Sequence, residues 1–563
     1  MKFQWFSVVF DEWIWYNYGM KREAIKITKT DLSAMSRHEL EEEYLKINDR
    51  LTALQIEAEW LREQLKVSRS KIFGKSSEKG LLDDGVQLSL FNEVELHQNP
   101  QAEEPTAKEI IAQKQQGKKK GAKKQKVKSL PIERVEYRLQ EEEQVCPRCG
   151  ESLHVMKKEV HDEIEVIPAQ YRIHRTVRYV YACRNCEKTG TEATIIRPDA
   201  PSPFFRNSLA SPSLVADIIH RKYVLALPLY RQEQEFRRYG LSISRQTLSN
   251  WVIRSVDQYL YRIYEGMKRY LLSCDILHAD ETEVQVLHEP GRSPSNKSYM
   301  WVYTSGRYEK PCYVYEYAPG RGSAYPKNFL RNFTGYLQTD GYAVYEKVAA
   351  DPDREEDHPV ISVGCLAHAR RKYTDALKAS PVKDPPNITK GIRYCDALFA
   401  IEKECADFDP EKRKEYRKSH AEPLLDEYFA WVRSIQPEVL PKSKLGEAVT
   451  YSLNQEKALR RYLEDGRLEI SNNRAERAVK PFVIGRKNWL FSNTPDGAAS
   501  SAMLYSIAET AKACELKPLE YLEYVLKTLS QTPETDIESL LPWSDQLPDG
   551  CRIKESDPEE DEA

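Results

Sequence analysis

The chain has 563 residues, of which 40% are hydrophobic and 30% are charged, so it is long enough to form several domains with real cores. Lys and Arg (84) nearly balance Asp and Glu (87), so net charge identifies no partner, although basic runs and an acidic tail are segregated. No run of about 18 apolar residues occurs, which excludes a membrane-spanning helix. The eleven cysteines fit metal binding plus reduced thiols better than a disulfide scaffold, and so predict a cytoplasmic protein.

Apolar residues predict a coiled coil within residues 37–100. They recur in alternating steps of four and three, which is a heptad seam: Leu40, Tyr44, Ile47, Leu51, Leu54, Ala58, Leu61 and Leu65. Such a seam would join copies of the chain into a homo-oligomer, although a helix packed on its own domain would show the same pattern. Residues 1–36 are poorly defined, and Met20 is an alternative start.

Residues 101–135 form a basic linker. The stretch "KEIIAQKQQGKKKGAKKQKVK" has too little apolar surface to fold alone. Such a run either serves as a solvated connection or follows a phosphate backbone without sequence preference.

Two C-x-x-C pairs within residues 136–200 predict a zinc finger. Four thiolates suit a tetrahedral Zn²⁺ site, and here they come from Cys146, Cys149, Cys183 and Cys186. Because cysteine fills all four positions, this zinc would be structural rather than catalytic.

Residues 201–265 predict a helix-turn-helix. One helical segment ends at Gly240, and the next begins after Ser242 or Ser244 with apolar residues on one face. Its outer face carries side chain types that read base edges in the major groove: Arg245, Gln246, Ser249 and Asn250. Helical hairpins also occur inside larger domains, so a packing role fits the same pattern.

Residues 266–495 predict an α/β domain. The runs "LLSCDILHADETEVQVL", "SYMWVYTS" and "PCYVYEYA" read as three neighbouring strands, and "GYLQTDGYAVY" and "VISVGCLAHARRKY" each begin with a further strand. This order is typical of a ribonuclease-H-like fold. An α-helical insertion occupies about 372–468, and a small helical region (496–535) and an acidic tail (536–563) follow.

Three carboxylates are candidates for a magnesium site. Asp280 lies on the first strand of the core, and Asp340 ends a later strand beside Gly341. Acids at the ends of adjacent strands can meet at one sheet edge, where Mg²⁺ prefers a few carboxylates plus substrate phosphates. Glu476 would supply the third ligand from a helix packed beside that edge.

Cationic side chains surround these acids. Glu476 lies within a basic helix that Asn472 or Asn473 can cap and that Pro481 should end or kink. Two clusters are candidates for holding DNA strands: Arg477, Lys480, Arg486 and Lys487 near Glu476, and His368, Arg370, Arg371 and Lys372 after the last strand. A surface ion-pair cluster is the alternative explanation for such a helix.

Several motifs together resemble the transposases of the insertion sequence 66 family, a branch of the DDE transposases. They are "DETEVQV", "LQTDGYAVY", "GCLAHARRKY", "SNNRAERAVKPFVIGRKNWLF", "IFGKSSEK", "QLSLF" and the "CPRCG…CRNC" finger, and they span about Leu40 to Leu529 in the family's order. The resemblance implies a multidomain α/β protein. Its ribonuclease-H-like catalytic core carries a helical insertion and follows an N-terminal coiled coil, a four-cysteine zinc finger and a helix-turn-helix. The acids carried over are Asp280, Asp340 and Glu476.

The resemblance also implies a reaction and partners. Two Mg²⁺ ions, with Mn²⁺ as a substitute, would support hydrolysis at the ends of the element and attack of the freed 3′-hydroxyl on target DNA. Double-stranded DNA would be the partner, with accessory proteins of the same element, so we expect a nucleoid-associated location. Cys365 and His368 would border the active site, in a structural or a catalytic role.

Two other functions use the same features. A ribonuclease-H-like nuclease would need the same acids but would cut DNA without strand transfer. A catalytically idle DNA-binding regulator would keep the finger, the helix-turn-helix and the coiled coil, although the intact acid triad argues against it.

Overall fold

The computed structural model describes residues 36–65 with short gaps, 170–182, 195–196, 198–351, 359–382 and 384–553. The four zinc-finger cysteines and the basic linker lie outside these ranges. The chain divides into two compact units: Met1–Glu78 with Lys372–Thr389 and Ile435–Thr450, and Lys79–Arg371 with Lys390–Ser434 and Tyr451–Ala563. No helix in the described ranges is long and apolar enough to cross a membrane.

Helices precede the main sheet. After the short pair β1 (Tyr181–Ala182) and β2 (Ile195–Ile196) come α7 (Pro212–Ile219), the π-helix η2 (His220–Val224), α8 (Leu229–Arg238), α9 (Arg245–Ser255), the π-helix η3 (Val256–Leu260) and α10 (Tyr261–Leu272). Ser244 begins α9, because its hydroxyl accepts a hydrogen bond from the N–H of Thr247. Gly240 makes the turn between α8 and α9 with a φ of 80°, which glycine adopts without strain.

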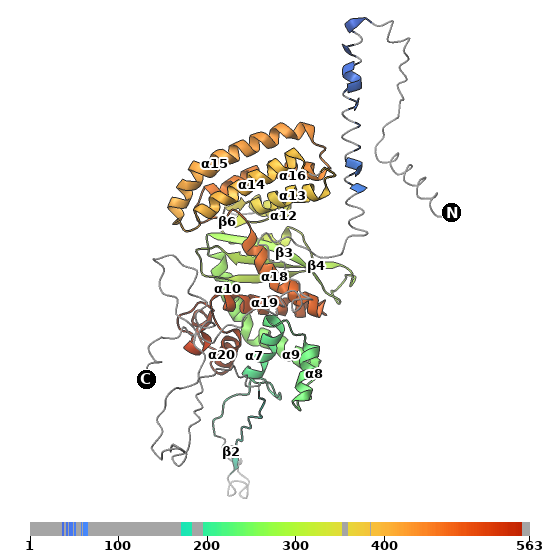
Figure 1. Cartoon of the computed structure of the whole chain (residues 1–563). Coiled ribbons are helices and arrows are strands. Elements are labelled where there is room, and N and C mark those ends of the chain that lie inside the picture. The colour runs from blue at the N-terminus through green and yellow to red at the C-terminus, as the bar shows by residue number, and fades with distance from the viewer. Residues whose placement is uncertain are drawn as a thin grey trace, which may run out of the picture. The chain divides into compact units, whose positions relative to one another are not determined.

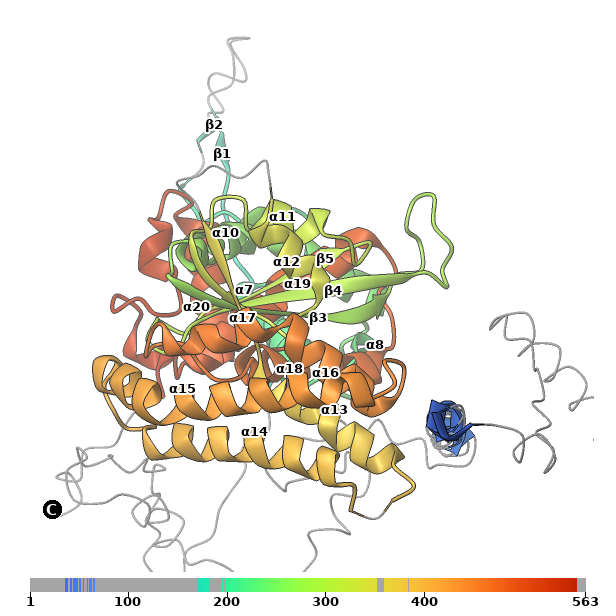
Figure 2. The same cartoon turned by 90° about the horizontal axis from the view of Figure 1, so that it is seen from above.

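Five strands form the central sheet in the order β5-β4-β3-β6-β7, and Figure 1 labels β3, β4 and β6 of this sheet. They are β3 (Ile276–Gln285), β4 (Lys297–Ser305), β5 (Tyr313–Ala318), β6 (Gly335–Gln338) and β7 (Val360–Val363), which confirms the five predicted strands. β3, β4 and β5 are antiparallel neighbours, whereas β6 and β7 run parallel to β3. β3 and β4 have 10 and 9 residues against 4 in β6 and in β7, so their hairpin extends beyond the sheet (Figure 2).

One face of the sheet is covered by two short helices, α11 (Ala324–Phe329) and α12 (Ala343–Ala349). Phe329 stacks on Tyr303 of β4 with 3.8 Å between ring centroids, and Tyr345 meets Trp301 edge-on at 5.8 Å. All four aromatic side chains are buried. Aromatic packing of this kind contributes beyond its buried area, so this face of the sheet is a structural core.

The opposite face carries α18 (Asn473–Trp489) and α19 (Pro495–Ala513), which contact β3, β4 and β5 (Figure 1). The Tyr315 hydroxyl of β5 donates to the carbonyl of Ala478 in α18. Across the sheet Tyr315 pairs with Val302, and Val302 pairs with Asp280. Because directly paired residues share a face, Asp280 lies on the side of the sheet that α18 covers.

The chain from β7 to α18 is helical. It comprises α13 (Leu366–Ala379), α14 (Pro386–Glu404), α15 (Pro410–Ile435), η4 (Gln436–Glu438), α16 (Lys444–Asn454), α17 (Glu456–Arg460) and η5 (Arg461–Leu463). After α19 come α20 (Pro518–Gln531), η6 (Ile537–Leu540) and η7 (Asp549–Cys551). In the larger unit, buried Arg417 of α15 pairs with Glu402 of α14 at 2.6 Å.

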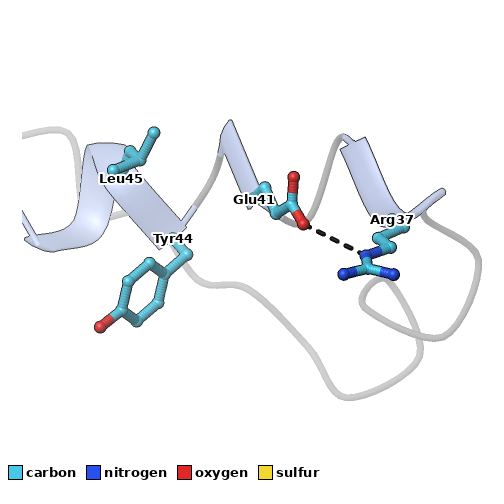
Figure 3. A pocket seen from close by; sticks show the side chains of 4 residues that line it. All are labelled: Arg37, Glu41, Tyr44 and Leu45. Carbon is cyan, nitrogen blue, oxygen red and sulfur yellow. Dashed lines mark hydrogen bonds and ion pairs between the residues drawn. The ribbon is translucent and has the colours of Figure 1, made fainter.

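The described residues between 37 and 65 are helical. Most of the predicted seam is described, and its large apolar side chains are between 41% and 68% exposed: Tyr44, Ile47, Leu51, Leu54, Leu61 and Leu65. Leu40 lies outside the described residues. Near the start of this helix, Arg37 and Glu41 form an ion pair of 3.2 Å beside a hollow that Tyr44 and Leu45 also line (Figure 3).

Helix α18 continues through Pro481, because "FVIGRKNW" belongs to the same helix; of the two predicted effects, an end at this proline is wrong and a kink stays a prediction. Proline removes one helical hydrogen bond, to the carbonyl four residues earlier. That carbonyl belongs to exposed Arg477, where water can replace the lost donor. Beyond the proline, buried Phe482 packs against Tyr505 of α19. A Cβ on Gly485 would lie 2.1 Å from the Tyr505 hydroxyl, so close helix packing maintains the second half of α18.

Candidate active site at the edge of the sheet

Asp280 lies on β3, and Asp340 follows β6, the parallel neighbour of β3. β3 and β6 are paired up to His278 and Gln338, and each aspartate comes two residues after its member of this pair. Alternation along a strand therefore places both carboxylates on the same side of the sheet. Asp280 is partly buried, and its Oδ1 accepts the N–H of Glu281 at 2.8 Å.

The turn after β6 fixes the backbone at Asp340. Gly341 has a φ of 83°, and a Cβ there would lie 2.9 Å from the side chain of Gln455, so both conformation and space require glycine. Asp340 Oδ1 accepts the N–H of Tyr342 at 2.9 Å, and its carbonyl accepts the Tyr451 hydroxyl at 2.8 Å. The side chain of Gln455 therefore approaches the backbone closely at this glycine.

Asn472 ties the start of α18 to β3. Its side chain amide donates to the carbonyl of Ala279 at 2.9 Å, and its Oδ1 lies 3.1 Å from His278 Nδ1. Its own N–H donates to Cys365 Sγ at 3.1 Å, and its carbonyl accepts the N–H of Glu476 at 3.2 Å. Asn472 occupies the predicted N-cap position, but its side chain makes no capping bond; it instead fixes Glu476 one turn away from the strand of Asp280.

The three acids interact electrostatically. Burial raises the pKa of Asp280 well above its usual range, and the carboxylates of Glu281, Asp340 and Glu476 raise it further. A carboxyl group in this setting favours a compensating cation, and carboxylate oxygens are ligands that Mg²⁺ prefers. Within the described ranges, however, no three His, Cys, Asp or Glu side chains are grouped closely enough to hold a metal ion as they stand.

Glu476 is already paired with a cation. Nη2 of Arg371 lies 3.1 and 2.9 Å from its two carboxylate oxygens, and Nδ1 of His368 lies 3.6 Å from one of them. Nη1 of Arg371 is 3.0 Å from His368 Nε2. The donor set therefore fits a divalent cation by chemistry, and one of its three acids, Glu476, is already paired with Arg371.

His278 and Glu469 complete the buried surroundings, and sequence reasoning did not single them out. His278 is fully buried, and burial is the main cause that lowers its pKa to about 4, so the ring is neutral near pH 7. Its Nε2 lies 3.6 Å from Glu469, whose carboxylate also pairs with Arg474 at 3.0 Å. The alternation of "HAD" on β3 is the signal that could have placed His278 on the face of Asp280.

The other predicted cations occupy different settings. On α13, Arg370 pairs with Asp396 at 2.5 Å, and Lys372 follows Arg371 along the helix. On α18, Arg477 and Lys487 are exposed and Lys480 is partly exposed. Arg486 donates to the carbonyl of Glu283 on the β3–β4 hairpin. The α18 cations thus lie along one helix that begins at the acids and runs to the hairpin.

The side chains predicted to read bases lie on α9. Arg245, Gln246 and Asn250 are exposed and Ser249 is partly exposed, while Leu248 and Trp251 turn inward. The guanidinium of Arg245 lies 5.8 Å from the ring of Tyr230 on α8. Asn250 lines a surface hollow with Asn207, Ser208, Thr247, Trp251, Ile253 and Arg254. These four residues lie on one face of α9, an element that carries none of the three acids.

Models of protein families match most of the chain. The model of the Transposase IS66 family matches residues 207–500, more than half of the 563 residues. The zinc-finger binding domain of transposase IS66 matches residues 143–187, and the IS66 C-terminal element matches residues 506–543. The model described as Transposase C of IS166 homeodomain matches residues 60–135.

Similar curated proteins come from Sinorhizobium fredii (strain NBRC 101917 / NGR234). The relative named "Uncharacterized protein y4jD" is 30% identical over 424 residues, which cover 74% of this chain and 81% of the relative. "Uncharacterized protein y4qI" is 31% identical over 397 residues, which cover 68% of this chain and 70% of the relative. From the family models and these matches together, the chain belongs to the IS66 family of transposases.

Proposed function

We propose that this chain is a DDE transposase that cleaves DNA at the ends of an insertion sequence and transfers the freed 3′-hydroxyl into target DNA. The observation that best supports this proposal is the register of β3 and β6, in which Asp280 and Asp340 occupy equivalent positions, with Glu476 on the helix α18 that contacts β3. The strand order, with three antiparallel strands followed by two parallel ones, supports a ribonuclease-H-like core.

Asp280, Asp340 and Glu476 would hold Mg²⁺, or Mn²⁺ in its place. When bound, the ions would activate the attacking oxygen and stabilise the leaving one. Asn472 would keep Glu476 close to β3 through its bonds to Ala279 and to the N–H of Glu476, and the turn at Gly341 would hold the backbone of Asp340. The finger at residues 143–187 would hold a structural Zn²⁺ on Cys146, Cys149, Cys183 and Cys186, and we expect Cys149→Ser to release zinc and unfold the finger rather than slow the chemistry directly.

DNA would be held at three places. The exposed face of α9 would read base edges through Arg245, Gln246, Ser249 and Asn250. The cations of α18 and those of α13 would bind phosphates near the acids.

The exposed apolar seam of the N-terminal helix supports self-association, because a second copy is the partner that a heptad seam fits.

The test uses full-length protein with DNA that carries the element's own ends, first with Mg²⁺ and then with EDTA. We expect cleavage and strand transfer with Mg²⁺ and neither with EDTA. Asp280→Asn should abolish both steps and leave binding of the ends near the wild-type level, since this substitution removes a charge from the metal site only.

A pre-cleaved end separates strand transfer from cleavage. If the protein cuts intact ends but never joins a pre-cleaved end to target DNA, a nuclease explains the chain better. If the wild-type protein binds ends but neither cuts nor joins them with Mg²⁺, a DNA-binding regulator does. Loss of end binding in Asp280→Asn with cleavage intact would show that the residue roles are wrongly assigned.

A further inference from the structure

Arg371 occupies the carboxylate that the metal site would need. One terminal nitrogen, Nη2, is shared between both oxygens of Glu476 at 3.1 and 2.9 Å. The other terminal nitrogen lies 3.0 Å from His368 Nε2, and the second ring nitrogen of His368 faces Glu476 at 3.6 Å. Glu476 thus has its charge compensated within the protein by residues of α13.

Arg371 is the more exposed residue of this ion pair. The side chain of Arg371 is 38% exposed, whereas that of Glu476 is 17% exposed. Arg371 is therefore the member of the pair that solvent, and a phosphate arriving from solvent, can reach more easily. A guanidinium and a divalent cation repel each other, so the two compete for the same carboxylate oxygens.

We propose that Arg371 is a gate on the metal site: it holds Glu476 while no DNA is bound and moves to a DNA phosphate when DNA arrives. This inference rests on the proposed function and adds regulation to the same site. The exchange replaces an arginine–carboxylate pair by an arginine–phosphate pair, and guanidinium groups bind both anions well. Glu476 then becomes available to the cation that the phosphate itself helps to attract.

The gate has a functional consequence for a DNA-cutting enzyme. Without DNA, the third acid is withheld and the divalent cation is bound weakly. When DNA is bound, its phosphates draw Arg371 away, and Glu476 becomes available as a metal ligand. Metal binding and DNA binding are then coupled, and linkage requires each to strengthen the other by the same factor.

The test measures Mn²⁺ binding to full-length protein without DNA, from the electron paramagnetic resonance signal of free Mn²⁺. A double variant, D280N with E476Q, gives the background from other sites. We expect Arg371→Gln to bind Mn²⁺ at the acids about tenfold more tightly than the wild type, which is within the usual range of coupling between sites. Added DNA should tighten wild-type binding far more than binding by R371Q.

Arg474→Gln is the matched control for the loss of one positive charge. Arg474 lies on α18 near Glu476, but its guanidinium pairs with Glu469 at 3.0 Å. General electrostatics predicts similar effects of R474Q and R371Q, whereas the gate predicts a clearly larger effect of R371Q. Arg371→Lys retains the charge but not the shared nitrogen, so it should lie between the wild type and R371Q, and it provides the same test if R371Q does not fold.

Two results would overturn the gate. One is equal Mn²⁺ affinity of R371Q and the wild type in the absence of DNA, and the other is an equal gain in R474Q and R371Q. Failure of the proposed function looks different, because then the double variant would bind as much Mn²⁺ as the wild type even with DNA present.

Discussion

Two arginine–glutamate pairs of the larger unit differ in how completely the arginine is used. Arg417 is fully buried, and its Nε and Nη2 contact the two oxygens of Glu402 at 2.6 and 2.8 Å. Its remaining N–H groups reach the carbonyls of Tyr462, Asp465 and Leu468. All five donors of this guanidinium are therefore satisfied by fixed partners.

The Arg371–Glu476 pair differs in its exposure and in its contact with the carboxylate. Arg371 is 38% exposed, and it places one nitrogen rather than two on the carboxylate. The same residue types thus form a permanent joint when every donor is buried and, as the gate proposes, an exchangeable contact when one side faces solvent. The first kind belongs to the helical scaffold and the second to the candidate active site.

The largest expected effect comes from breaking the permanent joint. Arg417→Met should lower the free energy of unfolding by about 3–5 kcal/mol, because it leaves Glu402 and three carbonyls without their donor. Urea unfolding followed by circular dichroism measures this loss. Arg433→Met removes an exposed partner of Glu456 and should cost less than about 1 kcal/mol. Equal losses in the two variants would contradict the role assigned to Arg417.

Asn472→Ala should be the next most severe change, because it removes both side chain bonds that join α18 to β3. We expect a loss of about 3 kcal/mol in the free energy of unfolding, since buried groups on Ala279 and His278 lose their partners. Strand cleavage should fall by about 100-fold, since Glu476 is no longer held in place. Asn473→Ala, at the exposed neighbouring position, is the control and should leave both quantities nearly unchanged.

The pH dependence of stability tests the buried surroundings of the site. His278 has a pKa of about 4 in the folded protein against 6.5 when unperturbed, so the unfolded chain takes up this proton first as the pH falls. The contribution of the neutral His278 ring to the free energy of unfolding is fully present above pH 6.5. It falls by roughly 3 kcal/mol between pH 6.5 and about 4. Unfolding at several pH values measures the slope. His278→Gln should flatten it, and an unchanged slope would contradict the prediction.

The sequence predicted the strands better than it predicted the contacts of the site. Regular alternation and β-branched or aromatic residues are local signals, and they placed the five strands and the two aspartates on the sheet. Pro481 shows the limit of local rules, because packing of Phe482 and Gly485 on α19 outweighed the tendency of proline to end a helix.

The missed features of the site depend on long-range contacts. Asn472 resembled an ordinary helix cap in sequence, but its partners Ala279 and Cys365 lie 193 and 107 residues away. Arg371 resembled one more DNA-binding cation, and its pairing with Glu476 joins residues 105 positions apart. No periodicity records such pairs, so a single sequence supplies the residues of the site without supplying their partners.

The smallest expected effect on stability comes from the exchangeable contact. Arg371→Ala should change the free energy of unfolding by less than about 1 kcal/mol, because solvent screens a pair of which one member is well exposed. If Arg371 moves to a phosphate when DNA binds, the same variant should lower the slope of log K against log salt for DNA binding by about 1. Arg467→Ala is the control, since Arg467 is similarly exposed at 34% and pairs with Asp275.

These two measurements on Arg371→Ala separate a gate from a structural ion pair. A stability loss comparable to that of Arg417→Met, with an unchanged salt slope, would mean that Arg371 is a permanent joint like Arg417. A small stability loss with a reduced slope, and no change of slope in Arg467→Ala, would mean that the guanidinium exchanges one anion for another. The two outcomes cannot both hold, because an arginine that stays on Glu476 in the complex releases no counterion from DNA.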